Sequence, residues 1–546
     1  MSKRGEDLVF TTFGPHFSVK LLSLGRQENH FHLDPIYPKP TKGGDFMKNF
    51  LLMLVVLCFL APSVVWGAPT GKLIIAQGVD LTSLDPVKLA ATGEMNYANA
   101  VFDKLYLFDV NGNTVPRLAV SHKMVNETTW EFKLRSGVKF HNGDLFTAAD
   151  VKFSIERFLD PKIKSPFASF MKGIKEVKII NDHTVQIITD KPDPLLQKRF
   201  AFILFIVPSK YIKEKGEDHF GRNPVGCGPF KFVEWVRADR LVLEAYEQYW
   251  AGSPLVKTVV FRAIPEDSTR MAELQTGMVD IIVNIPPFLV NQLKGRPGID
   301  VQSVPGARVM LLYINTLAPG PLQDKRVRQA LNYAVDKKII IERILSGSAF
   351  PMATNLNPYY FGYDDTLKPY PYDPEKAKKL LAEAGHKDLK IVLNTPSGRY
   401  LLDKQVSEAI AGMFEKAGIK IDFKVREWGD YVKDLLSKKL VDLGLIQNGL
   451  IMYDADGLLS LYYIKESPFC YYSDPEIQNW IIEARYSMDQ KKRKDLYGKI
   501  SKKIFEEAPF VFLYQPQDFW GVSRKVKGFQ ARGDELFFLY RVSVEK

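Results

Sequence analysis

The chain has 546 residues, of which 46% are hydrophobic and 12% aromatic, so it can bury more than one core. Because domains usually contain about 100 to 200 residues, we expect two or three lobes. The formal charge of +11 is compatible with nucleic acid or an anionic surface as a partner, but Lys and Arg are interspersed with Asp and Glu along the whole chain. This mixing favours a solvated basic surface, and we expect no nucleic-acid partner.

The segment 47–67 has the pattern of a secretory signal peptide. It has a lysine, Lys48, near its start, continues with the apolar run 50–60 and ends in small residues. A membrane-spanning helix needs about 20 apolar residues, and Pro62 interrupts this run early. We expect cleavage after Gly67 and export of the mature protein.

Residues 1–46 are polar and mixed, and they precede what reads as a complete signal peptide. We therefore expect that translation begins at Met47. The alternative is an internal membrane anchor with a cytoplasmic tail, and the intact mass of the exported protein distinguishes the two. Without residues 1–67 the chain keeps 67 basic and 58 acidic side chains, so the mature protein stays basic, with a formal charge of +9.

The cysteines bear on the compartment. Cys58 lies in the expected signal peptide and lacks the small residues that precede a lipidated cysteine, so we expect a soluble protein and not a lipoprotein. Cys227 and Cys470 remain, and an oxidising compartment permits a disulfide between them. Free buried thiols agree with the sequence equally well.

The first part of the expected mature chain mixes strands and helices. Strands are predicted over 73–76 and 130–134, and a helix capped by Thr147 continues through Phe158. The stretch 177–188 reads as a hairpin around a polar turn. This order of elements predicts a mixed α+β region.

The later half alternates helices and strands. A helix is predicted from Asp373 to Gly385, followed by a strand over 389–393, a helix over 403–417 and a strand over 419–425. Such alternation favours right-handed crossovers and a parallel sheet that is covered on both faces. This lobe is therefore predicted to be α/β.

Five motifs cover nearly all of the expected mature chain. The first contains LRSGVKFHNG and the second is NPVGCGPF. In order, the five lie at 130–151, 223–230 with 244–250, 324–336, 372–377 and 506–514. Together they resemble family 5 of the bacterial extracellular solute-binding proteins, which holds dipeptide, oligopeptide, glutathione and nickel receptors. The chain departs from this family at Cys227, where Thr or Ser is usual.

Each motif also has a purely structural explanation. Strand packing, helix capping and backbone freedom at Gly226 and Gly228 would account for most of these residues. The motifs therefore identify an architecture, and they do not by themselves mark a binding pocket.

The resemblance implies a fold like that of type II periplasmic binding proteins, with mixed α+β and α/β lobes, a hinge and an extra domain. Lobe I would comprise 68–106, 221–312 and 507–546, the extra domain 107–220, and lobe III 313–506. Crossovers near Tyr313 and Glu506 would form the hinge. A solute would be enclosed between lobes I and III, and the closed monomer would dock on ABC-transporter permease subunits. No cofactor is expected.

The resemblance also suggests which residues contact the solute. These candidates come from three stretches of the chain, namely Gly93, Glu94 and Met95, then Arg399 and Tyr400, then Asn448, Gly449, Tyr453, Asp454 and Asp456.

One of these stretches departs from the peptide-binding relatives. There a Trp follows the glycine, and an Asp, about three residues before an acidic-Pro step, anchors the α-amino group of the peptide. When Asp454 is aligned with the acidic residue of the acidic-Pro step, Leu450 stands in place of the Trp and Ile451 in place of the amine-anchoring Asp. We therefore predict that ordinary di- and tripeptides bind weakly, unless Asp454 or Asp456 takes over the amine.

Arg399 lies in a loop that follows a predicted strand, at the edge where open α/β sheets bind ligands. Its position resembles that of an arginine with which dipeptide-binding relatives hold a substrate carboxylate. The planar guanidinium suits this role because it donates two parallel hydrogen bonds. The alternative is an ion pair between Arg399 and Asp403, four residues further on.

A secreted hydrolase is the rival class. The sequence contains neither a Gly-x-Ser-x-Gly elbow nor a His-Glu-x-x-His pair. After residue 67 the histidines are far apart, at His122, His141, His183, His219 and His386. His141 is expected to hold a loop. Asp454 and Asp456, on one face of a strand, could hold an amine as easily as transfer protons. We expect no catalysis, and a metal-chelate receptor of the nickel type is the closer alternative.

Overall fold

The computed structural model describes residues 68–89, 92–397, 399–449 and 452–545. The expectations for the extension 1–46, for the signal peptide 47–67 with Cys58, and for Leu450 and Ile451 lie outside these residues. None of the helices in the described part of the chain is long and apolar enough to cross a bilayer.

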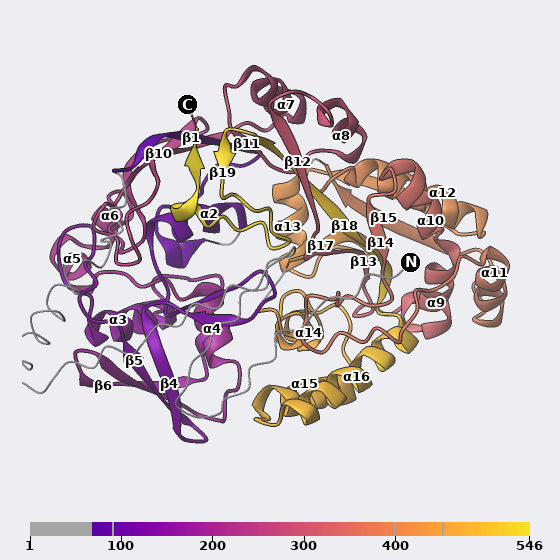
Figure 1. Cartoon of the computed structure of the whole chain (residues 1–546). Helices are drawn as coiled ribbons and strands as arrows, with labels where there is room; N and C mark the ends of the chain where they lie inside the picture. Colours follow the sequence, from indigo (N-terminus) through magenta and orange to yellow (C-terminus); the bar gives the residue numbers. More distant parts are fainter. Residues whose placement is uncertain (1–67, 90–91, 398, 450–451, 546) are drawn as a thin grey trace, which may run out of the picture. The chain divides into compact units, whose positions relative to one another are not determined.

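A mixed sheet of 12 strands runs through the described chain, in the order β16-β15-β17-β13-β18-β11-β1-β10-β9-β8, with β12 and β14 also paired to β18 (Figure 1). Its strands are β1 (Thr70–Gln77), β8 (Phe230–Val236), β9 (Arg240–Ala245), β10 (Val256–Ala263), β11 (Ile281–Ile282), β12 (Ile299–Pro305), β13 (Val309–Ile314), β14 (Ala349–Pro351), β15 (Lys390–Pro396), β16 (Lys420–Arg426), β17 (Leu443–Asn448) and β18 (Phe510–Ser523). The parallel pairs are β1 with β10 and β11, and β15 with β16 and β17.

The first part of this sheet, from β8 to β12 with β1, is covered on both faces. One core gathers around Tyr97 of α2 (Thr92–Val101) and Trp520 of β18. A second, smaller core lies under α7 (Asp267–Thr276) and α8 (Pro287–Leu293). The C-terminal residues pack into the first core, so the two ends of the described chain are part of the same hydrophobic unit.

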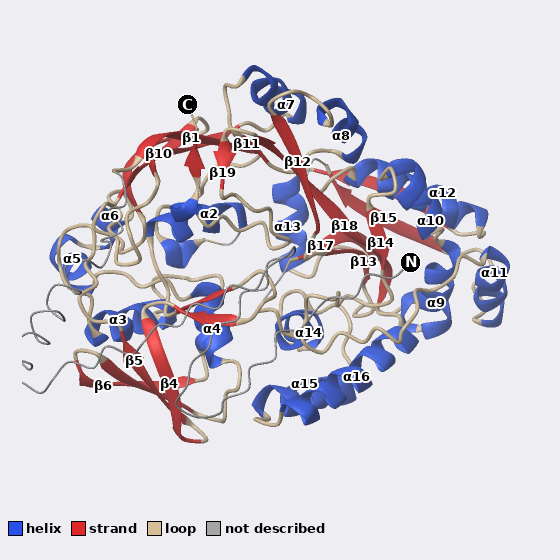
Figure 2. Ribbon diagram, in the orientation of Figure 1, coloured by secondary structure: helices blue, strands red, loops and turns tan. Residues whose placement is uncertain are grey.

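The second part of the sheet, β13 to β17, is also covered on both faces, as Figure 2 shows. Alternate residues of β13 point to opposite sides, since Leu311 belongs to one core and Leu312 to the other. The helices on one side are α9 (Lys325–Ala334), α11 (Pro374–Glu383) and α12 (Asp403–Lys416), and those on the other are α13 (Trp428–Leu436), α14 (Ala455–Tyr463), α15 (Pro475–Tyr486) and α16 (Gln490–Glu507).

The predicted α/β pattern is confirmed for β15, α12 and β16, which form a strand–helix–strand unit with parallel strands. Asp373 caps α11, as expected. The sheet differs from the expectation in one respect: β13 pairs antiparallel with both β17 and β18. The chain enters this part through β13 and leaves it through β18, and these two linking strands make the sheet mixed.

The stretch near residues 107–220 forms a separate antiparallel sheet, β4-β5-β7-β6, with α3 and α4 in its core. The predicted hairpin is confirmed, and Thr147 with Asp150 forms the capping box of α3. The elements are β2 (Tyr106–Phe108), β3 (Thr114–Pro116), β4 (Ala119–Asn126), β5 (Thr129–Leu134), α3 (Ala148–Leu159), β6 (Ile174–Asn181), β7 (Thr184–Thr189), α4 (Leu196–Ile203), α5 (Ser209–Lys215) and α6 (Glu217–Phe220).

Two crossovers join the two parts of the large sheet. One is the turn between β12 and β13, around Gly306. The other lies within β18, whose residues up to Pro516 pair with β13 and β14 and whose residues from Gln517 pair with β12. Both crossovers lie several residues from the expected hinge positions, Tyr313 and Glu506. Tyr313 already pairs with β17 inside the second part of the sheet, because β13 belongs to that part over its whole length.

Gly226 and Gly228 are needed for a reason other than the expected backbone freedom. Neither has a positive φ, but a Cβ atom on Gly226 would lie 2.0 Å from the carbonyl oxygen of Val101, and one on Gly228 would lie 2.6 Å from its carbonyl carbon. The two glycines allow close approach of the backbone to the end of α2.

His141 holds this same turn, as expected. Its Nε2 lies 2.9 Å from the carbonyl oxygen of Gly228, and its Nδ1 accepts a hydrogen bond from the backbone N–H of Gly226. Burial lowers the pKa of His141 to about 4, so the ring is neutral at neutral pH. Because Nδ1 accepts a hydrogen bond, Nε2 is protonated and donates to the carbonyl oxygen of Gly228.

The two cysteines in the described chain are both buried and free. Cys227 packs in the core of the four-stranded sheet, whereas Cys470 donates a hydrogen bond to the carbonyl oxygen of Tyr472. Of the two alternatives left open by the sequence, the structure has the free buried thiols.

Candidate functional site

The crossovers bring a buried charge cluster together. Arg308, between β12 and β13, forms ion pairs with Asp518 of β18, at 2.6 Å, and with Glu535 of the C-terminal segment. Burial, with the nearby charge of Glu535, raises the pKa of the Asp518 carboxyl to about 7, although Arg308 opposes this. Through these two ion pairs, the guanidinium of Arg308 links both crossovers to the C-terminal segment.

Tyr453 follows β17 and lies beside this cluster. Its hydroxyl donates to Oδ2 of Asp534 at 2.7 Å, and its ring centroid lies 4.9 Å from that of Phe108. Asp534 is also paired with Arg532, which donates to the carbonyl oxygens of Phe108 and Asp109.

Asp454 is fully buried and its carboxylate is held by the protein. Oδ1 accepts hydrogen bonds from Nη2 of Arg493 at 2.7 Å and from the hydroxyl of Tyr497 at 3.0 Å. It also caps α14 through the backbone N–H of Asp456. Nζ of Lys198, from α4, lies 3.6 Å from the other oxygen. A ligand amine would have to compete with two cations for this carboxylate.

Asp456 has different partners from Asp454. It pairs with Arg485 at 2.9 Å and accepts a hydrogen bond from Ser460. Burial alone would raise the pKa of Asp456, but the charges of Arg485 and Arg199 hold it below its usual value. The expected placement of these two acids on one face of a strand is wrong: Asp454 is the N-cap of α14 and Asp456 lies in its first turn.

Arg399 and Tyr400 follow β15, at the carboxyl edge next to β17. The guanidinium lies 5.0 Å from the ring of Trp428 and 5.2 Å from that of Tyr400, which is cation–π distance. Asp403 accepts hydrogen bonds from the backbone N–H groups of Arg399 and Tyr400. The expected alternative, an ion pair between the side chains of Arg399 and Asp403, is absent from the described residues.

The remaining candidates have structural partners. The side chain of Asn448 bridges the backbone N–H of Val309 and the carbonyl oxygen of Asn355, and the carbonyl oxygen of Gly449 accepts from Tyr360.

On α2, Glu94 accepts hydrogen bonds from the backbone N–H and hydroxyl of Thr82. Met95 is buried in the core of the four-stranded sheet, and Gly93 packs near Val79. The next residue of α2, Asn96, bonds to the backbone of Glu535 and Phe537 in the C-terminal segment.

The structure thus brings the candidates after β15 and β17 to one edge of the sheet, while those on α2 approach the C-terminal segment. Sequence reasoning missed the charged residues that link these groups. They are Lys198, Arg308, Arg493, Asp518, Arg532, Asp534 and Glu535. Their partners are far away in sequence, so no local pattern marks them.

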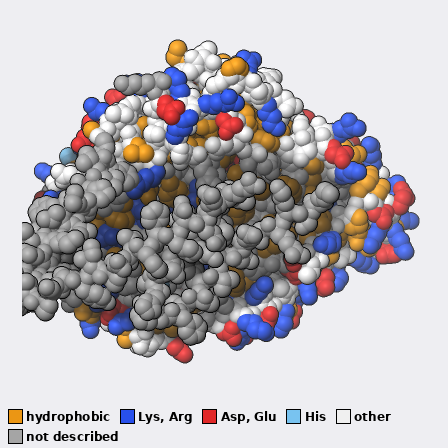
Figure 3. Space-filling model, in the orientation of Figure 1, with side chains coloured by type: hydrophobic (Ala, Val, Ile, Leu, Met, Phe, Trp, Pro, Cys, Tyr) orange, Lys and Arg blue, Asp and Glu red, His pale blue; other side chains and the backbone are white. Residues whose placement is uncertain are grey.

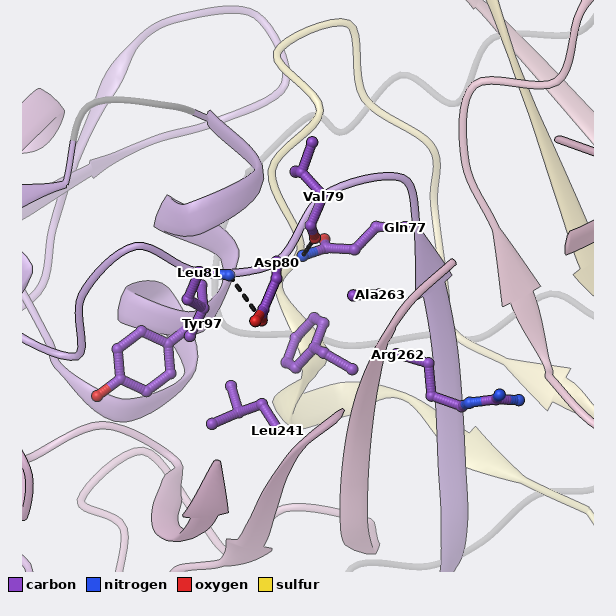
Figure 4. A pocket seen from close by; sticks show the side chains of 9 residues that line it. Gln77, Val79, Asp80, Leu81, Tyr97, Leu241, Arg262 and Ala263 are labelled. Atoms are coloured by element: carbon purple, nitrogen blue, oxygen red, sulfur yellow. Dashed lines mark hydrogen bonds between the residues drawn. The ribbon is translucent and has the colours of Figure 1, made fainter. Parts of the chain in front are cut away.

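Two small pockets lie outside this junction. The one in Figure 4 is lined by Gln77, Asp80, Tyr97 and their neighbours, and its volume of about 10 Å³ suffices for about one water molecule. The other, about 260 Å³, lies beside Leu145, and its charged groups are already paired, Lys210 with Asp144 at 3.1 Å. Neither is lined by the candidate solute-binding residues.

No group of three or more His, Cys, Asp or Glu residues is placed to hold a metal ion within 68–89, 92–397, 399–449 and 452–545. Figure 3 shows Lys and Arg mixed with Asp and Glu where described residues form the visible surface. This agrees with the interspersed charges of the sequence.

Comparisons with known proteins define the class. The chain is 28% identical to a glutathione-binding protein, GsiB, of Pectobacterium atrosepticum, over 90% of this chain and 97% of the relative. Its structure is similar to that of the periplasmic binding protein DppA of Helicobacter pylori in complex with a peptide (TM-score 0.78, 28% identity, 88% of this chain and 99% of the other). It is equally similar to NikZ of Campylobacter jejuni in complex with Ni(L-His) (TM-score 0.78, 27% identity, 87% and 100%).

The fold is therefore that of a type II periplasmic binding protein. The model of the bacterial extracellular solute-binding proteins, family 5, matches residues 113–468, and the chain belongs to this family. It is a solute-binding protein of the ABC-importer class, and its relatives are binding proteins of transporters, not enzymes.

Proposed function

We propose that this protein is a monomeric, periplasmic receptor that captures a small acidic or zwitterionic, peptide-like solute and delivers it to a membrane permease without catalysis. The observation that carries the choice of solute is the position of Arg399. Its guanidinium lies on aromatic rings at the carboxyl edge of β15, and no described residue forms an ion pair with it.

A guanidinium in this position suits a carboxylate. Contact with the faces of Trp428 and Tyr400 leaves the in-plane N–H groups available, and these can donate two parallel hydrogen bonds to one carboxylate. We place the site between lobe I, with the proposed boundaries 68–106, 221–312 and 507–546, and lobe III, 313–506. A bound solute would shield this contact from water. We place the hinge at the two sheet crossovers, near Gly306 and Pro516.

The first experiment is a thermal-shift screen of the exported protein against pooled peptides, opines, sugars and metal chelates. A solute that binds the folded state raises the melting temperature by mass action. Replacing Arg399 with alanine should then weaken the best hit at least thirtyfold, which corresponds to about 2 kcal/mol, because a charged contact in a closed site is lost.

Calorimetry measures this affinity, and Arg326→Ala is the matched control. Arg326 is also an exposed arginine, but it is paired with Asp324 at 2.6 Å. An affinity for Arg399→Ala within threefold of the parent would remove Arg399 from the site. A hit that is consumed during incubation would favour a hydrolase.

We also expect common dipeptides to bind weakly, with dissociation constants above the micromolar range. The amine anchor of peptide-binding relatives is replaced at Ile451, and Asp454 is already held by Arg493, Tyr497 and Lys198. Calorimetry with Ala-Ala, Gly-Leu and Met-Leu tests this expectation, and micromolar or tighter binding of any of them would refute it.

A metal chelate is the second candidate, favoured by the similarity to NikZ in complex with Ni(L-His). A carboxylate of the chelating amino acid could use Arg399 in the same way, and the metal would arrive inside its chelator. The same calorimetry with nickel and histidine together, and with nickel alone, separates this candidate from the first.

A further inference from the structure

Tyr453 lies in an uncommon backbone conformation. Both Met452 and Tyr453 have positive φ, 61° and 50°, a region that residues with a Cβ rarely adopt. Such conformations persist only where the surroundings fix them. Here the carbonyl oxygen of Tyr453 accepts hydrogen bonds from Nζ of Lys198 at 2.9 Å and from the backbone N–H of Phe361 at 3.2 Å.

Because of this strained backbone, neighbouring side chains pack in different cores. Met452 and Ala455 pack in the core under α14 and α15, whereas Tyr453 packs in the core of the four-stranded sheet with Phe108. Apart from Tyr453, the buried residues of that second core all lie between 87 and 227. Tyr453, which follows β17 of the large sheet, therefore extends into the core of the four-stranded sheet.

The receiving surface fits the ring closely. Gly112, in the turn between β2 and β3, has φ of 80°, and a Cβ atom there would lie 2.2 Å from the Tyr453 ring. Beyond the ring, Oδ2 of Asp534 accepts a hydrogen bond from the hydroxyl of Tyr453 at 2.7 Å. Arg532 orients this carboxylate by donating a hydrogen bond from Nε to Oδ1. A hydrogen bond to a buried carboxylate is stronger than one between neutral groups.

We propose that Tyr453 is a latch that holds lobe III closed against lobe I and the domain at 107–220 by means of the chain's own residues. This proposal rests on the two-lobe arrangement of the proposed function. The latch lies next to the residues expected to meet the solute, so the solute does not by itself have to provide all of the free energy of closure. Opening moves Tyr453 away from Phe108 and Asp534 and lets Met452 and Tyr453 leave their strained conformation.

The test measures lobe separation in the exported protein with no solute added. Spin labels are attached to cysteines at Met124, on β4, and Ile482, on α15, which are 45% and 41% exposed, while the native thiols are buried. Pulsed electron paramagnetic resonance then gives the distribution of distances between the labels. We expect a narrow, short distance in the labelled parent and a broad, longer one with Tyr453→Ala.

Tyr453→Phe keeps the ring and removes the hydroxyl, so it tests the bond to Asp534 without disturbing the packing. We expect the closed-to-open ratio to fall about tenfold in this variant. Tyr431→Phe is the matched control, because the buried hydroxyl of Tyr431 donates to Leu445 within lobe III alone.

Three outcomes would overturn the proposal. One is a Tyr453→Phe distribution that superimposes on that of the parent. Another is a parent that is already as open as Tyr453→Ala, and the third is an equal shift in Tyr431→Phe, which would indicate general loosening. Because no solute is used, failure to find one would contradict the proposed function and leave this result unchanged.

Discussion

Replacing Arg493 with methionine is expected to lower the free energy of unfolding by about 3 to 5 kcal/mol, since it leaves the buried carboxylate of Asp454 without its nearest cation. Nη2 of Arg493 lies 2.7 Å from Oδ1 of Asp454, and both side chains are almost completely buried. Tyr497 still donates a hydrogen bond, and Lys198 at 3.6 Å supplies a more distant charge. Urea unfolding of the parent and the variant measures the difference.

Lys492→Met is the matched control on the same helix. Lys492 pairs with Glu483 at 2.8 Å, but both side chains are about half exposed, so we expect a loss of about 0 to 1 kcal/mol. The double variant Arg493→Met, Asp454→Asn should recover part of the loss, because the amide carries no charge to be left unpaired. A loss below 1 kcal/mol in Arg493→Met would show that Lys198 alone neutralises Asp454.

The second large effect is expected at Gly226. Alanine there would place a Cβ atom 2.0 Å from the carbonyl oxygen of Val101, so the backbone must move apart, and we expect a loss of about 3 kcal/mol of unfolding free energy. The movement also breaks the hydrogen bond from the backbone N–H of Gly228 to the same oxygen, at 2.9 Å, and the contacts of Gly226 with His141.

Gly498→Ala provides the comparison for this prediction. Gly498 lies in the interior of α16, and a Cβ atom there would meet nothing within 4 Å. Alanine favours helix over glycine, so this variant should gain up to about 1 kcal/mol. Equal unfolding free energies for Gly226→Ala and the parent would contradict the prediction, because they would show that the backbone around Gly226 can move away from Val101 without loss of stability.

Local patterns predicted much of the fold. The helix α12 and the strands on either side of it follow from apolar spacing, and the capping box of α3 follows from Thr147 and Asp150. The helix start at Asp454 could also have been recognised, because a carboxylate two residues before a free backbone N–H is a capping pattern. The expected strand with two acids on one face is wrong at this place, because Asp454 is the N-cap of α14.

The contacts of the candidate site could not be predicted in this way. Arg493 lies in the run KKRK, which resembles a solvated basic surface, and its partner Asp454 is 39 residues away. Tyr453 and Asp534 are 81 residues apart. Each of these pairs joins elements that are far apart in the sequence, and neither the period nor the composition of a segment contains that information.

The long strand β18 has a consequence for the order in which the protein folds. It is formed by residues Phe510–Ser523, yet it pairs with β11, β12, β13 and β14 in the middle of the large sheet. During synthesis these partners emerge from the ribosome long before β18 does, so their edges stay unpaired until the chain is nearly complete. Closing such distant pairs is slow. A chain cut short before Phe510 would therefore lack the strand that its two halves share.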